Sequence, residues 1–371
     1  MTTIQEGQTE LHFQDLRVTD KEFRKYLHEL IDSLCDSGIY INGVYTSSFA
    51  DLLSEYTGIE SFTPVGNGTN ALEIILRYLK ILGFKSVGCQ ANAGGYSSGA
   101  ALLNGLSVIL VDVNSSTGLV DLAHLEEAYR REKFDIFVYT HLYGNGQNLL
   151  DIQNFCERED IVLVEDCAQA FGLKIDNKHV GSFGRFSAFS FYPTKNLGTL
   201  GDAGAIACSL NDTSSIKSLT QYGWKSRYSI EIQNGTNSRI DEFHAGILSK
   251  LLFQVDSNSR SRVHKLGLYQ ENMPKEIGSF ITTSNSVAHL AVLKCTNRQE
   301  VKKVLDKENI PYSVHYPIPD HKQVAWKHLF TNLNLPNSEK LSESILSLPL
   351  GRHYSPKVIF EICRLLRQVG N

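Results

Sequence analysis

Short apolar, β-branched runs alternate with helix-like segments between residues 60 and 210, and this alternation constrains the fold more than any other feature. The expected strands are Ser86–Cys89, Val108–Asp112, Asp135–Tyr139, Ile161–Glu165, Phe186–Phe191 and Ala203–Cys208. Strands that alternate with helices are typical of a mostly parallel sheet that is covered by helices on both faces. The sequence therefore predicts an α/β domain built around such a sheet.

The pattern changes after about residue 245, where a long helical stretch, Ala245–Glu271, begins. An α+β region follows, with helices near Arg298–Glu308 and Ser355–Val369. We expect a large domain over residues 1–245, including an N-terminal arm, and a smaller C-terminal α+β domain over residues 246–371. A chain of 371 residues is long enough for both.

Composition excludes several classes of partner. Lys and Arg total 36 against 40 Asp and Glu, and no basic block could neutralise a nucleic acid or an anionic membrane surface.

The seven cysteines are scattered without a C-x-x-C pair, so we expect reduced thiols and no metal site. MTTIQEGQTE lacks the features of a signal peptide, and no run of 18 apolar residues occurs. We expect a cytoplasmic protein that does not enter the membrane.

A glycine-rich element, GNGTN at Gly66–Asn70, precedes a helical pattern that ends near Gly83. GNGTNA also fits the G-x-G-x-x-A pattern of dinucleotide-binding folds, which require an acidic residue about 20 residues further on. That region, SVGCQAN, has none, so the dinucleotide hypothesis is weak. A helix N-terminus with close backbone amides still predicts a site for a phosphate group.

Two further motifs follow expected strands. IVLVEDCAQAFG places Asp166 and Gln169 at a strand end, where open α/β sheets bind ligands, and FSFYPTKNLG places Ser190 and Lys195 after another strand. A phosphate site, a carboxylate and a lysine are the groups that pyridoxal phosphate (PLP) needs. The lysine binds it covalently, the carboxylate keeps its ring nitrogen protonated, and amide and hydroxyl groups hold its phosphate.

With these motifs, the sequence resembles the sugar aminotransferases of the DegT/DnrJ/EryC1/StrS family, which have the fold type I of aspartate aminotransferase. The resemblance covers almost the whole chain. It is carried by GNGTNALE, HLYGNGQNLLDI, VEDCAQAFG, SFYPTKNLGTLGDAGAI, YGWKSRY, GTNSRIDEFHAGIL and VHYPIPDHKQ. It implies PLP as the cofactor and a homodimer with two shared active sites.

The resemblance also implies roles for single residues. Lys195 would bind the cofactor covalently and move protons, Asp166 would contact the ring nitrogen, and Gln169 would reach the phenolic oxygen. The implied cofactor contacts are Gly68, Thr69, Asn70, Tyr96, Asp166, Gln169, Ser190 and Asn237. Asn237 would reach the phosphate of the other subunit. A histidine at position 195 would instead have indicated a sugar dehydratase.

The aromatic residue that covers the cofactor ring is harder to locate, because ANAGGYSSGAA departs from the family's pattern and an ungapped count puts a glycine there. Tyr96 is the expected residue, with core packing as its alternative role. Positions that line the substrate cleft in relatives are matched by Tyr192, Lys225, Tyr228, His315 and His321.

The forms YG-x-K-x-x-Y and G-x-N-S-R-x-D-E most resemble family members that aminate dTDP-linked 3-keto-6-deoxyhexoses, and the family implies L-glutamate as amino donor. The product would be a 3-amino-3,6-dideoxy sugar of a surface glycan such as the lipopolysaccharide O-antigen. The alternatives are a 4-aminotransferase acting on a UDP- or GDP-4-keto sugar, a cyclitol aminotransferase, and a relative without enzyme activity. The last would have little reason to keep Lys195, Asp166 and Gln169 together.

Overall fold

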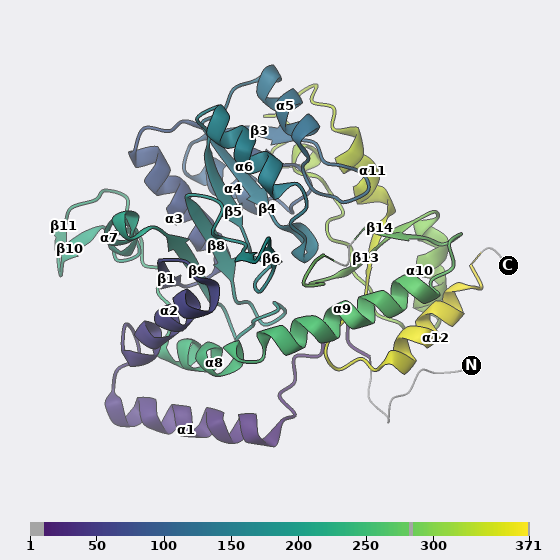
Figure 1. Cartoon of the computed structure of the whole chain (residues 1–371), viewed down its shortest axis with the longest axis horizontal. Helices are drawn as coiled ribbons and strands as arrows, with labels where there is room; N and C mark the ends of the chain where they lie inside the picture. Colours follow the sequence, from purple (N-terminus) through teal and green to yellow (C-terminus); the bar gives the residue numbers. More distant parts are fainter. Residues whose placement is uncertain (1–10, 282–284, 370–371) are drawn as a thin grey trace.

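A seven-stranded sheet forms the centre of the computed structural model, which describes residues 11–281 and 285–369. Its strand order is β1-β9-β8-β5-β4-β2-β3 (Figure 1). The strands are β1 (Ser61–Val65), β2 (Ser86–Gln90), β3 (Ser107–Val111), β4 (Ile136–Thr140), β5 (Val162–Asp166), β8 (Phe186–Ser190) and β9 (Gly204–Cys208). All six expected strands are present. The neighbouring strands in the part of the sheet ordered β8-β5-β4-β2-β3 all pair in parallel, as predicted.

The sequence did not predict two features of this sheet. β9 pairs antiparallel with both of its neighbours, β8 and β1. β1 itself was not predicted, because its sequence, SFTPV, contains Pro64, and a proline is tolerated in an edge strand but rarely in a central one. The sheet is therefore mostly parallel, with an antiparallel edge.

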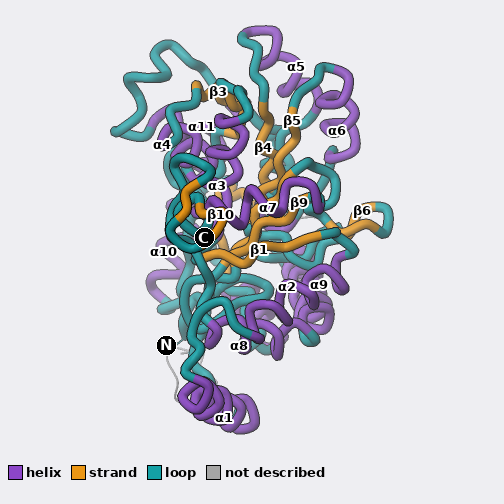
Figure 2. The backbone as a smooth tube through the Cα atoms, turned by 90° about the vertical axis from the view of Figure 1, so that its left-hand side faces the viewer, coloured by secondary structure: helices purple, strands orange, loops and turns teal. Residues whose placement is uncertain are grey.

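Helices cover both faces of the sheet (Figure 2). Side chains alternate along each strand, so Ile136 and Val138 of β4 face one cluster while Phe137 and Tyr139 face another. The first face is covered by α3 (Gly68–Ile81), α4 (Tyr96–Leu103) and α7 (Leu210–Leu219). The second is covered in part by α5 (Leu122–Arg131) and α6 (Leu149–Arg158).

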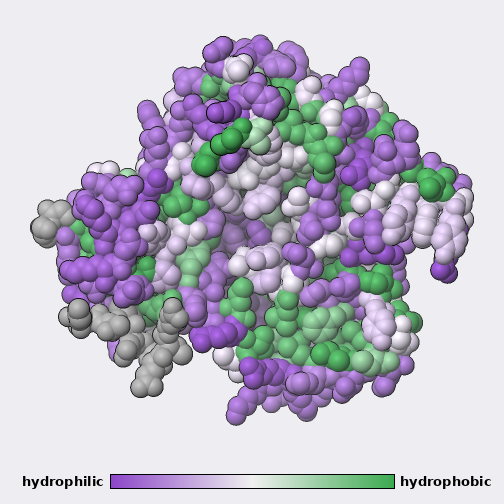
Figure 3. All heavy atoms as spheres, turned by 180° about the vertical axis from the view of Figure 1, so that it is seen from behind, coloured by the Kyte–Doolittle hydropathy of each residue, from purple (hydrophilic) through white to green (hydrophobic). Residues whose placement is uncertain are grey.

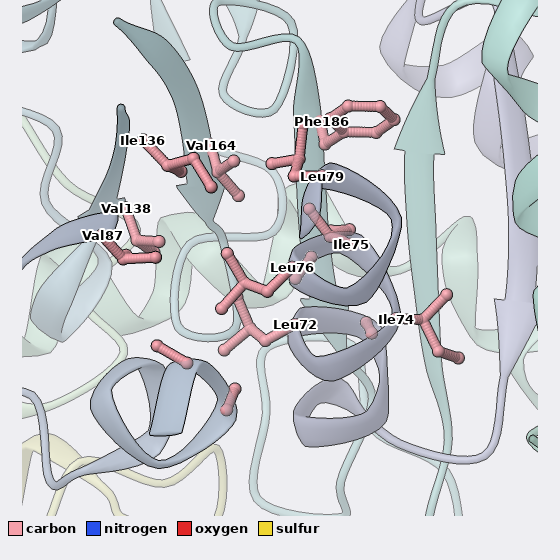
Figure 4. Close-up of a cluster of buried hydrophobic side chains, with 14 of the residues drawn as sticks. Leu72, Ile74, Ile75, Leu76, Leu79, Val87, Ile136, Val138, Val164 and Phe186 are labelled. Carbon is pink, nitrogen blue, oxygen red and sulfur yellow. The ribbon is translucent and has the colours of Figure 1, made fainter. Parts of the chain in front are cut away.

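Helix α3 packs on the sheet through its apolar side. Leu72, Ile75, Leu76 and Leu79 recur at helical spacing and point toward the strand residues (Figure 4). At its N-terminus the Asn67 side chain accepts a hydrogen bond from the Asn70 amide at 2.8 Å, which caps the helix. The helix is therefore held firmly with its N-terminus at one edge of the sheet.

The N-terminal helices pack under the β1 edge. α2 (Val44–Thr57) lies against α8 (Glu242–Leu252), and α1 (Lys21–Ser37) packs on α8. The buried Glu242 carboxylate accepts hydrogen bonds from the amides of Gly43, Tyr45 and Thr46 at 2.8–2.9 Å, and also from the Thr46 hydroxyl. It thus satisfies the free amides at the start of α2. The expected N-terminal arm was given no bounds, and residues 1–10 at its start lie outside the described residues.

The C-terminal part is built on an antiparallel sheet of β12 (Gly278–Phe280), β13 (Ala291–Cys295) and β14 (Ile345–Leu348). It is packed with α9 (Val255–Asn272), α10 (Arg298–Lys307) and α12 (Pro356–Leu366), and α11 (Pro336–Ser344) precedes β14. The helical stretch expected over Ala245–Glu271 is two helices, α8 and α9, which are separated near Phe253 and Gln254.

The expected boundary between residues 245 and 246 falls inside α8. Leu248 and Leu252 of this helix pack in the same cluster as Phe49 of α2 and Phe191. We propose two lobes that divide near this helix, a large one on the seven-stranded sheet and a small one on the three-stranded sheet.

Two short hairpins lie outside the two larger sheets. One pairs β6 (Lys174–Ile175) with β7 (Lys178–His179), and the other pairs β10 (Trp224–Ser226) with β11 (Ser229–Ile230). The β10–β11 hairpin projects from the body of the molecule (Figures 1 and 3). Among residues 11–281 and 285–369, no helix has the length and apolar character needed to cross a membrane.

Candidate active site

A cavity of about 700 Å³ opens at the carboxyl ends of β4, β5 and β8, beside the N-terminus of α3. This is the edge of a parallel sheet at which ligands of α/β folds bind. Most of the predicted site residues line it, namely Gly68, Thr69, Asn70, Tyr96, Asp166, Gln169, Ser190, Tyr192, Lys195 and His315. Asn237, Lys225, Tyr228 and His321 do not.

The α3 corner of the cavity is packed so closely that only glycine fits. A Cβ atom at Gly68 would lie 2.7 Å from Cβ of Ser190, and one at Gly204 would lie 2.5 Å from the backbone carbon of Asn67. The ends of β8 and β9 therefore approach the first turn of α3, where backbone amides have no partner within the helix. These amides and the Ser190 hydroxyl suit a phosphate group.

Asp166 is the last residue of β5, and its carboxylate is buried beside the cavity. It accepts hydrogen bonds from the Ala168 amide at 3.1 Å and from the Thr140 hydroxyl at 3.4 Å. Burial raises its pKa, while the Ala168 amide and the charge on Lys195 act in the opposite direction. A buried carboxylate with so few partners favours a cationic ligand such as a protonated ring nitrogen.

Lys195 follows β8 in a turn closed by a hydrogen bond from its amide to the Tyr192 carbonyl at 2.8 Å. Burial lowers the pKa of its amine to about 8, and the nearby charge of Asp166 opposes this shift. At pH 7 about a tenth of the amine is therefore unprotonated, far more than for an ordinary lysine, and a nucleophilic lysine requires this form. Asp166 and Lys195 are thus a carboxylate and a reactive amine in one cavity.

Gln169 is held on both sides of its amide. Its Oε1 accepts a hydrogen bond from the Tyr143 amide at 2.7 Å, and its Nε2 donates one to the Tyr316 hydroxyl at 3.1 Å. The amide is therefore fixed at the edge of the cavity, and Tyr316 brings a second lining ring from the C-terminal part of the chain.

Two histidines border Lys195 and are held in place by hydrogen bonds. His315 Nδ1 lies 2.8 Å from the Ser347 hydroxyl, and His289 Nδ1 lies 3.0 Å from Oδ1 of Asn196. Burial, followed by the charge of Lys195, lowers the pKa of His315 to about 4 and that of His289 well below its usual range. Both rings are therefore neutral at physiological pH. His289, Tyr316 and Phe13 line the cavity without having been predicted from the sequence.

The four remaining predicted residues lie elsewhere in the same chain. Lys225 pairs with Glu231 at 2.9 Å in the β10–β11 hairpin, and Tyr228 at its tip is 74% exposed. Asn237 is also exposed. His321 is buried, with Nε2 2.9 Å from Oε1 of Glu339. None of the four contributes to the cavity wall within one chain.

Outside the cavity, the described residues include one buried group of potential metal ligands, His141, Glu165 and Cys167. The Glu165 carboxylate already accepts hydrogen bonds from the amides of Gly181, Phe183 and Gly184 at 2.7–2.8 Å, and its Oε2 lies 2.8 Å from His141 Nε2. Because both of its oxygens are used in this way, the group anchors the loop before β8.

Known proteins are similar to this chain in sequence and in fold. Residues 20–367 match the model of the DegT/DnrJ/EryC1/StrS aminotransferase family. The chain belongs to this family. It is 31% identical to a dTDP-3-amino-3,6-dideoxy-α-D-galactopyranose transaminase of Aneurinibacillus thermoaerophilus, over 96% of this chain and 99% of the relative.

Two further relatives agree with this assignment. A dTDP-3-amino-3,4,6-trideoxy-α-D-glucose transaminase of Micromonospora megalomicea subsp. nigra is 30% identical, over 87% of this chain and 88% of its own length. The X-ray structure of S. venezuelae DesV in complex with a ketimine intermediate superposes with a TM-score of 0.90 at 28% identity, over 97% and 98% of the two chains. The predicted family, the type I fold, the aminotransferase class and the PLP cofactor are confirmed.

Proposed function

We propose that this aminotransferase converts a dTDP-linked 3-keto-6-deoxyhexose into its 3-amino-3,6-dideoxy sugar with L-glutamate as amino donor. The single observation that carries the chemical part is the meeting of Lys195, Asp166 and the α3 N-terminus in one cavity. The substrate part is supported by two relatives whose names specify 3-amino sugars linked to dTDP. The alternative of 4-amination on a UDP or GDP sugar is not favoured by these names.

The cavity residues fit the cofactor. The α3 amides and Ser190 would hold its phosphate, Asp166 its ring nitrogen and Gln169 its phenolic oxygen. When bound, PLP supplies an electron-withdrawing ring that stabilises negative charge on a neighbouring carbon. We assign proton transfer to Lys195 Nζ, because an amine with a pKa of about 8 can both accept a proton from the donor carbon and return one to the sugar carbon.

We further propose that the enzyme is a homodimer with shared active sites. Ile39, Tyr40, Val44 and Phe253 are each more than half exposed. Figure 3 shows hydrophobic residues gathered at the end of the molecule where α1 and α8 lie. Patches of this kind are typical of interfaces. A dimer would also provide a role for the exposed Asn237, Lys225 and Tyr228 at the partner's cavity.

The substrate proposal is tested by supplying the purified protein with glutamate and a panel of nucleotide sugars. The panel combines dTDP, UDP and GDP with 3-keto and 4-keto deoxyhexoses, and the product is identified by mass spectrometry and NMR. We expect the fastest turnover with the dTDP 3-keto sugar. Faster turnover of a UDP or GDP 4-keto sugar would overturn the positional assignment and leave the aminotransferase class intact.

The cellular setting that we propose is the cytoplasm, with the amino sugar serving a surface glycan such as the lipopolysaccharide O-antigen. Deletion of the gene should then remove the amino sugar from the purified glycan, as measured by sugar analysis. Restoration by the wild-type gene and not by a Lys195→Ala variant would connect this loss to the transamination.

A further inference from the structure

Tyr316 occupies the space that a side chain at position 94 would need. A Cβ atom built on Gly94 would lie 2.9–3.0 Å from Cδ1, Cε1 and Cε2 of the Tyr316 ring. Contacts of similar length to three ring carbons place this position over the face of the ring. Gly94 also has a φ of +77°, which favours glycine. The backbone at Gly94 therefore leaves room for a ring that comes from elsewhere in the chain.

The ring of Tyr316 is fixed at the cavity wall. Its hydroxyl accepts a hydrogen bond from Nε2 of Gln169 at 3.1 Å. The preceding residue, His315, is held through its carbonyl by the Tyr143 hydroxyl at 2.6 Å and through its ring by Ser347. Burial raises the pKa of the Tyr316 phenol, and the nearby Tyr96 and Asp166 add to this shift. Tyr316 is therefore a neutral ring beside the carboxylate and the amide that we assign to the cofactor.

Tyr96, the residue expected from the sequence to cover the cofactor, has a different environment. Its side chain is 49% exposed, and its ring meets Tyr316 edge-on, at 6.1 Å between centroids and an angle of 70°. It lines the cavity, but about half of its side chain is open to solvent. Of the two rings, Tyr316 is the better held and the more protected from water.

We propose that Tyr316 is the aromatic residue that covers the ring of the bound cofactor. Glycine is required at position 94 because any side chain there would overlap the Tyr316 ring. This inference rests on the proposed use of the cavity for PLP. A tyrosine ring attracts a protonated pyridine ring through its face and excludes water from it. The hydroxyl bond to Gln169 would fix the orientation of the tyrosine.

Replacing tyrosines at positions 316 and 96 tests the assignment on the full-length protein. PLP is added to the apoprotein, and its dissociation constant is measured by quenching of protein fluorescence and by cofactor absorbance. We expect Tyr316→Ala to weaken PLP binding about tenfold, because the stacking and the water-excluding cover are lost. Tyr316→Phe keeps the ring and should stay within about threefold of wild type. Tyr96→Ala should have a smaller effect than Tyr316→Ala.

A further substitution tests the role of Gly94. Gly94→Ala should weaken PLP binding, because its methyl group displaces the Tyr316 ring. Gly83→Ala is the matched control, since Gly83 also has a positive φ, +104°, but no atom lies within 4 Å of the place that its methyl group would take. Adding Gly94→Ala to Tyr316→Ala should cause little further loss, because the displaced ring is already absent. Thermal melting of each apoprotein separates these effects from unfolding.

The outcomes separate this inference from the function on which it rests. A wild-type protein that does not bind PLP would contradict the proposed function. If wild type binds PLP normally and Tyr96→Ala weakens PLP binding more than Tyr316→Ala does, only the assignment of the covering ring would be overturned. An equal loss in Tyr316→Phe and Tyr316→Ala would also overturn it, because the hydroxyl rather than the ring would then be responsible.

Discussion

The cavity wall and the β10–β11 hairpin differ in how completely one chain forms them. In the wall, the buried side chains of Asp166 and Gln169 are held by hydrogen bonds, and Lys195 is half-buried beside them. In the hairpin, Lys225 and Tyr228 are largely exposed and do not line the cavity. Both regions carry motifs of the same family. Their difference fits the proposed dimer, in which one chain forms the cavity wall and the exposed hairpin of the second chain would complete the site.

The largest expected effect concerns the wall. Lys195→Ala should lower turnover by about 10⁴-fold or more, because both the covalent attachment and the proton transfer are lost. Turnover of glutamate with a keto sugar is the measurement. In the wild type, borohydride reduction and peptide mapping should place the pyridoxyl group on Lys195. Lys303→Ala, at an exposed lysine of α10, is the control, and a label on another lysine would refute the assignment.

Asp166→Asn should weaken PLP binding by about 10- to 100-fold, because a charge-assisted bond to the ring nitrogen is replaced by a neutral one. The apoprotein should respond differently. Burial raises the folded-state pKa of Asp166 above its unfolded value, so the ionised group destabilises the apoprotein above that unfolded pKa. The variant should therefore melt no lower than wild type at pH 7. A marked fall in melting temperature would show a structural role instead.

The hairpin side of the comparison is tested with mixed dimers. Lys195→Ala subunits are combined with Asn237→Ala subunits, which puts both changes in one site and leaves the other site intact if the sites are shared. Asn237→Ala alone should weaken cofactor binding by about tenfold or more. Mixed dimers should therefore regain activity at limiting PLP. An unchanged activity, or a fully active monomer, would contradict the shared site.

The smallest effect is a pH dependence of the wall. The Lys195 amine is protonated below its pKa of about 8 in the apoprotein, and only the neutral form attacks the cofactor. The rate of covalent attachment should rise with pH and level off above about 8, changing by about fivefold between pH 7 and pH 8. Stopped-flow absorbance of apoprotein mixed with PLP measures it. A midpoint near 10 would mean that the amine is not shielded from water.

The sequence predicted what local patterns encode. The strands that carry Asp166 and Ser190 have strong apolar runs, and Lys195 lies in a short motif. Glycine spacing indicated the α3 N-terminus. Tyr316 was not predicted as a site residue although it lies in the VHYPIPDHKQ motif beside His315, because the motif does not indicate which of its rings faces the cavity. His289 lies in none of the motifs and reaches the cavity through long-range packing of the C-terminal part. The antiparallel direction of β9 could not be predicted either, since a buried strand has a similar composition in both directions.

Helix α9 runs from the end of α8 toward α10 and α12 (Figure 1). Its first residue, Val255, packs in the cluster that contains Leu248 of α8, whereas its Leu266 and Tyr269 pack with residues of β13 and α12. An unbroken helix of 18 residues is about 27 Å long and resists bending. It would therefore form a rigid connection between the two lobes that we propose. A hinge within α9 would have to break or bend it. We therefore expect any wide opening of the cavity to turn at Phe253 and Gln254, where α8 ends and α9 begins, with α9 moving as one rigid body.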